Sequence, residues 1–145
     1  MKNVISKTIG FGLVAALLGL GGTTATAQSS RILNKVTVNA AGGDTFEVVE
    51  GSNHLGAQGM WCGAATYAKA NLGISGTTRI YVQTPRGNAV TAPGRKGVLF
   101  GLSVPAGAAP SDVFSVGASI RQPGANMSHD VAVQFCHFVL APFSR

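Results

Sequence analysis

The chain has 145 residues, of which 46% are hydrophobic and 11% charged, and its formal net charge is +6. This length suits one domain, because a single hydrophobic core usually serves about 100–200 residues. The composition is too apolar for a disordered chain, and the glycines follow no Gly-X-Y period, which excludes a collagen-like fold. A polytopic membrane protein is excluded as well, because the one apolar stretch that approaches the necessary length lies at the N-terminus.

Residues 1–27 have the three zones of a signal peptide. Lys2 and Lys7 give a positive start, an apolar stretch follows from Ile9 to Leu20, and Ala25-Thr26-Ala27 offers small residues for a signal peptidase. The apolar stretch is shorter than the ~20 residues of a transmembrane helix, and no basic stop-transfer cluster follows it. We therefore expect export, cleavage after residue 27 and no stable membrane insertion of the mature chain; an uncleaved N-terminal anchor is the alternative.

The mature chain, residues 28–145, is predicted to be one domain that carries a scattered positive charge. Cleavage removes residues 1–27 of 145 and leaves 118, and the loss of Lys2 and Lys7 lowers the net charge from +6 to +4. Basic residues adjoin only at Arg95-Lys96, so no basic run with interleaved aromatics indicates nucleic acid. A scattered positive excess favours loose association with anionic polymers of the cell envelope, although solubility explains it equally well. The specific partner stays unknown.

The two cysteines, Cys62 and Cys136, both lie in the predicted mature chain. Two cysteines in a small exported domain are most simply a disulfide, because the compartment is oxidising. Chain-entropy estimates give ~4 kcal/mol for a loop of this length. We expect the bond, and a free Cys62 thiol is the alternative.

Residues Met60–Leu72 are predicted to form the main helix. Trp61, Ala65, Ala68 and Leu72 recur at helical spacing and give one apolar stripe, in which Trp61 is expected to be a core anchor. Gly73 follows as a helix stop. Two short strands, Val36–Val38 and Phe46–Val49, are predicted before this helix.

After the helix the hydrophobic period changes from 3.6 to 2, which is typical of strands. The predicted strands are Thr78–Gln83, Val98–Val104, Phe114–Arg121 and Asp130–Leu140. The segment Asp130–Leu140 is apolar on both sides and is therefore predicted to be a central strand. Turns are predicted at residues 85–88 and 122–126. We expect an α+β fold in which one N-terminal amphipathic helix packs on a mainly antiparallel sheet of about four to six strands, stapled by one disulfide.

One arrangement of residues suggests nucleophilic catalysis. The order of a cysteine on a helix followed by a histidine on a later strand is shared with papain-like and peptidoglycan-cleaving cysteine peptidases. Cys62 would then attack, His129 would be the general base, and Gln58 would donate to the oxyanion. Against this hypothesis, strand alternation turns Cys136 to the face opposite His129, and if the helix packs on the Cys136 face, Cys62 meets Cys136 and not His129.

No metal or cofactor site is predicted. His54, His129 and His137 lack the i, i+2 or i, i+4 spacing that aims two ligands at one ion. His54 reads as a loop residue. Glu47 and Glu50 are expected to point to different faces of a strand, which argues against a pair of catalytic carboxylates.

A possible binding surface is formed by Arg79, Tyr81 and Arg121, which fall on the expected wet faces of two strands. A merely solvated face is the plainer interpretation of these three residues.

Four short segments carry a resemblance to other proteins: Trp61–Ala68, Arg79–Val82, Gly94–Phe100 and Gln134–Cys136. Over about residues 46–140 the chain resembles small exported alphaproteobacterial proteins of unknown function, with a Trp-Cys helix start and a second, C-terminal cysteine. The resemblance implies export and the two-cysteine pattern, and no activity. The leading hypothesis is therefore a non-enzymatic envelope or secreted binding or structural module. The alternative is a papain-like cysteine hydrolase, either a peptidase or a cell-wall amidase, that uses Cys62 and His129.

Overall fold

The structure, a computed structural model, describes residues 29–32, 36–52, 54–112 and 119–140. The predicted leader, residues 1–27, lies outside these ranges. In chain order the described elements are β1 (Ser29–Ile32), β2 (Val36–Gly42), β3 (Thr45–Glu50), α1 (Gly56–Leu72), β4 (Arg79–Asn88), β5 (Lys96–Gly101), β6 (Ser111–Asp112), β7 (Ala125–Ser128) and α2 (His129–Leu140).

The described strands form one sheet in the order β1-β2-β3-β5-β4-β7-β6. All neighbouring strands are antiparallel except the short β6, which pairs with β7 in parallel. This confirms an α+β fold with a mainly antiparallel sheet.

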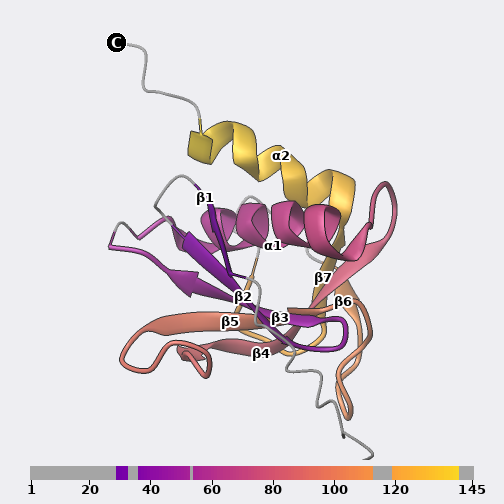
Figure 1. Ribbon diagram of the computed structural model, residues 1–145. Helices are drawn as coiled ribbons and strands as arrows, with labels where there is room; N and C mark the ends of the chain where they lie inside the picture. Colours follow the sequence, from indigo (N-terminus) through magenta and orange to yellow (C-terminus); the bar gives the residue numbers. More distant parts are fainter. Residues whose placement is uncertain (1–28, 33–35, 53, 113–118, 141–145) are drawn as a thin grey trace, which may run out of the picture.

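The molecule has three layers, with α1 between the sheet and α2 (Figure 1). Helix α1 lies close to β2 and β3 because Gly63 faces the sheet: a Cβ atom there would be 3.0 Å from a methyl of Val48 and 3.2 Å from one of Val36. The outer helix α2 packs mainly on α1. The sequence between Gly59 and Ala68 is rich in alanine and glycine, so both neighbours can approach α1 closely.

Aromatic side chains fill the space between α1 and the sheet. Trp61 is fully buried, and its ring centroid lies 4.9 Å from that of Phe100 in an edge-to-face contact. Phe46 stacks on Phe100 at 6.1 Å and meets Tyr67 of α1 at 4.9 Å. The predicted role of Trp61 as a core anchor is confirmed, and the predicted stripe does face the core.

Helix α1 is not N-terminal, contrary to the expected fold, and the two short strands predicted before it are present within β2 and β3. Strands β2 and β3 precede it and form the surface on which it packs. The helix ends at Leu72 as predicted, and Gly73 caps it with a φ of 67°.

The predicted central strand Asp130–Leu140 is wrong, because these residues belong to α2. The buried or half-buried side chains His129, Ala132, Val133 and Cys136 follow the helical spacing i, i+3, i+4, i+7. Val131 and Phe138 are 45% and 72% exposed, so they lie on the outer side of the helix. These two exposed hydrophobic residues made the segment look apolar on both faces and hid the helical period.

Other boundaries differ from the predictions. Strand β4 continues through the predicted turn at 85–88, because register shifts relative to β5 let the strand bend without ending. Strand β7 takes in the end of the predicted turn at 122–126. Of the predicted strand Phe114–Arg121, residues 113–118 lie outside the described ranges, and Ser119–Arg121 form no strand.

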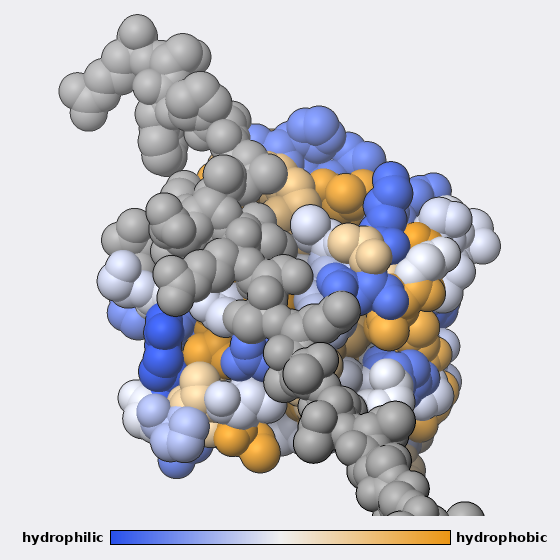
Figure 2. Space-filling model, viewed as in Figure 1, coloured by the Kyte–Doolittle hydropathy of each residue, from blue (hydrophilic) through white to orange (hydrophobic). Residues whose placement is uncertain are grey.

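Polar and apolar residues are interspersed on the face shown in Figure 2. None of the helices in the described ranges combines the length and hydrophobicity needed to cross a membrane.

Candidate functional site

An open cleft of about 590 Å³ lies where the end of β3, the start of α1 and the segment before β7 meet. Its lining residues are Glu50, His54, Gly56, Ala57, Arg86, Ser119, Ile120 and Arg121. The cleft therefore brings one carboxylate together with two guanidinium groups and an imidazole. With a neutral imidazole, these side chains carry one positive charge in excess.

Glu50 is the centre of the charged groups. Arg86 binds its carboxylate in a bidentate manner: Nε donates to Oε1, and Nη2 donates to Oε2 at 2.8 Å. The hydrogen bond from Arg86 lowers the pKa of Glu50 below its usual value, against an opposing effect of burial. The same pairing raises the pKa of Arg86. Both groups are therefore charged at neutral pH.

His54 lies at the mouth of the cleft, with its side chain 78% exposed. Its Nδ1 is 3.2 Å from Oε2 of Glu50. Because an ionised carboxylate only accepts hydrogen bonds, Nδ1 is the donor in this contact. The other ring nitrogen, Nε2, then accepts a hydrogen bond when the ring is neutral and donates one when it is protonated.

Backbone hydrogen bonds fix the segment that carries Arg121. The amide of Arg86 donates to the carbonyl of Ile120 at 3.1 Å, and the amide of Gly124 donates to the carbonyl of Val82 at 2.8 Å. Arg121 is exposed, and no side-chain carboxylate in the described ranges forms an ion pair with it. Its charge is thus available to a ligand, whereas that of Arg86 is largely taken by Glu50.

The predicted binding surface joins two residues of β4, Arg79 and Tyr81, to Arg121, which lies before β7. Arg79 and Tyr81 lie on β4, and Nη1 of Arg79 donates to Oδ1 of Asn126 at 2.5 Å. Only Arg121 belongs to the cleft. A surface formed jointly by all three residues stays a prediction.

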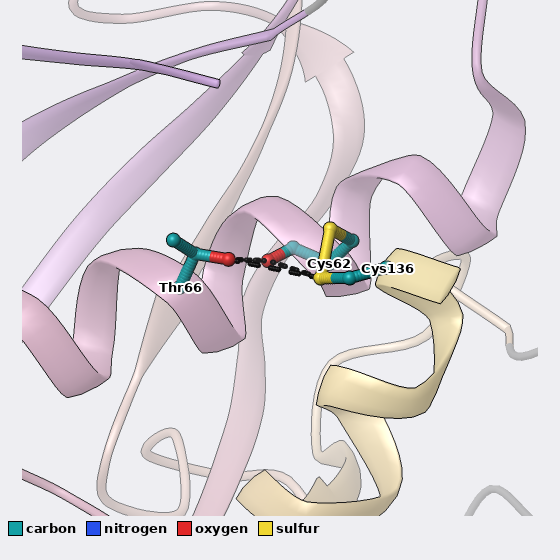
Figure 3. Close-up of a disulfide and its surroundings, with 3 residues drawn as sticks. All are labelled: Cys62, Thr66 and Cys136. Atoms are coloured by element: carbon teal, nitrogen blue, oxygen red, sulfur yellow. Dashed lines mark hydrogen bonds between the residues drawn. A yellow bond between two sulfur atoms is a disulfide. The ribbon is translucent and has the colours of Figure 1, made fainter. Parts of the chain in front are cut away.

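Cys62 and Cys136 form a disulfide that joins α1 to α2, with their Cα atoms 4.9 Å apart (Figure 3). The hydroxyl of Thr66 donates to the carbonyl of Cys62 at 2.9 Å and lies 3.7 Å from the sulfur of Cys136. Cys62 is 1% exposed. While the bond is closed, its sulfur has no thiolate and cannot act as a nucleophile.

The other two residues of the catalytic hypothesis lie on separate helices. His129 starts α2, is 3% exposed, and has Nδ1 3.3 Å from Oδ1 of Asp130. Its buried Nε2 has no hydrogen-bond partner among the described residues. Gln58 lies half-buried in the first turn of α1. The hypothesis that these residues act with Cys62 applies only to a form in which the disulfide is open.

The described residues contain no group of three or more metal-ligating side chains that could hold a metal ion. No family model matches the chain, and searches of curated proteins and of solved structures found no significant match.

Of the residues that line the cleft, only Arg121 was predicted from the sequence to belong to a binding surface. The separation of Glu50 and His54 by four residues was a weak signal, because that spacing indicates a contact only if the chain turns between them. The pairing of Glu50 with Arg86 joins β3 to a part of β4 that was predicted to be a turn, so it required the topology of the sheet.

Proposed function

We propose that the protein is an exported, disulfide-stapled and non-enzymatic binding module, and that its cleft binds anionic groups of cell-envelope components. The observation that carries the proposal is the position of Arg121 in a cleft with excess positive charge: its guanidinium forms no ion pair with the described residues, and backbone hydrogen bonds hold the segment on which it lies. Arginine is well suited to this task, because its planar donors match carboxylate, sulfate and phosphate oxygens.

The helix start at the cleft adds to this positive potential. Gly56 and Ala57 line the cleft and open α1, and the first turn contains no acidic residue and no side-chain cap. The backbone amides of a helix start carry partial positive charge, which favours an anion nearby.

The proposed site of action is the periplasm or the exterior of the cell. The predicted leader supports export, and a disulfide is compatible with an oxidising compartment. The positive charge of the mature chain would favour the first encounter with anionic polymers, and the cleft would then provide the specific contact.

The test is retention of the mature, oxidised protein on immobilised dextran sulfate, with uncharged dextran as the reference. Replacing Arg121 by glutamine removes one charge-assisted contact, which we expect to weaken retention about tenfold. The matched control is Lys69→Gln, which removes the same charge from the last turn of α1, away from the cleft. We expect little change in the retention of the control. Equal losses of retention in both variants would mean that net charge alone accounts for the binding.

The cysteine hydrolase remains a hypothesis without a structural observation in its favour. Intact mass after alkylation under denaturing conditions, with and without reductant, tests it directly. Two adducts only after reduction would mean a closed disulfide and no nucleophile. Two adducts without reductant would mean free thiols, and Cys62→Ser should then abolish turnover of amide substrates while Cys136→Ser should not.

A further inference from the structure

The cleft is larger than a small inorganic anion requires. Its volume of about 590 Å³ lies within the usual range of small-molecule sites. One water molecule takes up about 30 Å³ of the liquid, so the cleft has room for roughly twenty, which is the scale of one or more sugar rings. An organic ligand with several functional groups fits this space better than a lone oxyanion.

The polar groups of the cleft are of two kinds. Arg121 offers hydrogen-bond donors and a positive charge, whereas Glu50 and the neutral ring of His54 offer acceptors. Oε1 of Glu50 receives one bond, from Nε of Arg86, and a carboxylate oxygen can accept a second. A simple oxyanion brings only acceptors, so it leaves Glu50 and the neutral ring of His54 without donors. The cleft therefore favours a ligand that carries hydroxyl groups in addition to its negative charge.

The remaining lining is small or apolar. Ile120, which is 6% exposed, and Ala57 both line the cleft. Such a surface suits the C–H face of a sugar ring, while the ring hydroxyls reach the acceptors at the edge.

We infer that the ligand is a sugar acid, in the form of a uronate residue of an acidic polysaccharide. Its carboxylate binds Arg121, its hydroxyl groups donate to Glu50 and His54, and its ring lies against Ile120. Glu50 is the specificity-determining residue: it holds Arg86 in place and accepts hydrogen bonds from hydroxyl groups, which simple anions lack. This inference rests on the proposed function, because it names the ligand of the same cleft.

The experiment is isothermal titration calorimetry of the mature, oxidised protein with three probes: trigalacturonate, maltotriose and sulfate. Maltotriose has the size of trigalacturonate and the same number of ring hydroxyl groups, with primary hydroxyl groups in place of the carboxylates, and sulfate supplies charge without hydroxyl groups. We expect trigalacturonate to bind at least about tenfold more tightly than either. Arg121→Gln should remove about tenfold of that affinity, with Lys69→Gln as the matched control.

Glu50→Gln is the more specific test, because it removes the negative charge and keeps the size of the side chain. It should weaken trigalacturonate binding several-fold and strengthen sulfate binding, since Arg86 is no longer neutralised. Thermal unfolding followed by circular dichroism checks that each variant is folded.

Two results would overturn the inference in different ways. If sulfate binds with the same affinity as trigalacturonate and Arg121→Gln weakens both, the proposed anion site stands but the sugar acid is not its ligand. If Arg121→Gln changes the affinity for none of the three probes, the proposed function is contradicted as well. If Glu50→Gln raises the affinity for sulfate and for trigalacturonate alike, Glu50 does not accept hydrogen bonds from the ligand's hydroxyl groups.

Discussion

Strand β3 carries two carboxylates, Glu47 and Glu50, in contrasting surroundings. Glu47 is 2% exposed and accepts hydrogen bonds from the amide of Val90 at 2.9 Å and from the amide of Thr91 at 2.6 Å. The hydroxyl of Thr91 donates to it as well, at 2.5 Å. Glu50 instead pairs with Arg86 and His54 at the edge of an open cleft.

The difference shows that two carboxylates on one strand can have separate roles, one in holding a loop and one in lining a cleft. The donors to Glu47 come from a loop between β4 and β5, so its charge is used to hold that loop on the sheet. Glu50 is bound by side chains that water can also solvate, so its contacts can rearrange when a ligand arrives. We therefore expect substitutions of Glu47 to change stability, and substitutions of Glu50 to change binding.

The largest expected effect is that of Glu47→Ala. It leaves the amides of Val90 and Thr91 without their acceptor, which should lower the free energy of unfolding by about 3 kcal/mol. Urea unfolding measures the loss, and Glu50→Ala is the matched variant. The Glu50 side chain is 11% exposed, but the partners that it leaves behind, Arg86 and His54, are 42% and 78% exposed and can be solvated, so the expected loss is smaller, about 1–2 kcal/mol. Equal losses in the two variants would break the contrast between the carboxylates.

The second prediction concerns the space around Glu47. A Cβ atom at Gly97 would lie 3.2 Å from both Cγ and Oε1 of Glu47 and 3.2 Å from Cβ of Ala89. Because Glu47 is held by several hydrogen bonds, it cannot easily move away, and Gly97→Ala should cost about 1–2 kcal/mol. Adding Glu47→Ala should relieve the crowding, so the two losses should sum to less than their separate values. Simple additivity would mean that Glu47 is not held rigidly.

The third prediction is a pH dependence that belongs to Glu50. Its pKa in the folded state is lowered from 4.5, mainly by the hydrogen bond from Arg86. A lowered pKa means that this contribution to stability is present above the ordinary carboxyl pKa and is lost as the pH falls through the folded-state value. Between pH 7 and pH 3 the wild type should therefore lose more stability than Glu50→Gln, by less than about 1 kcal/mol. Identical pH profiles in urea unfolding would contradict the role of the Arg86 pairing.

The smallest effect on stability is expected for His54→Ala. The side chain is 78% exposed, so the free energy of unfolding should change by no more than about 0.5 kcal/mol. Affinity for trigalacturonate should nevertheless fall, because the ligand loses an acceptor at the mouth of the cleft. Unchanged affinity would limit the site to Glu50, Arg86 and Arg121.

The sequence predicted the parts of the fold that depend on local patterns. The stripe of Trp61, Ala65 and Ala68 correctly indicated the helix and its buried face, and the two cysteines correctly indicated the disulfide. The segment of α2 was misread because Val131 and Phe138 are exposed, and a solvent-exposed hydrophobic residue cannot be told from a buried one by its type alone.

The cleft depends on contacts between distant parts of the chain. Glu50 and Arg86 are 36 residues apart, and the segment that carries Arg121 is held by the amide of Arg86. No short-range period encodes such contacts, so from the sequence Arg121 could be named only as one charge on a wet face. Its neighbours in the cleft become visible only when β3, β4 and the start of α1 are placed in space.

The most direct test of the anion site is a ¹H–¹⁵N correlation spectrum of the mature, oxidised protein during titration with sulfate at constant ionic strength. We expect the largest shifts at the amides of Gly56, Ala57, Arg86 and Arg121, and we expect Arg121→Gln to abolish them. Shifts that are as large at Lys69, in the last turn of α1, and that Arg121→Gln leaves unchanged would contradict binding in the cleft.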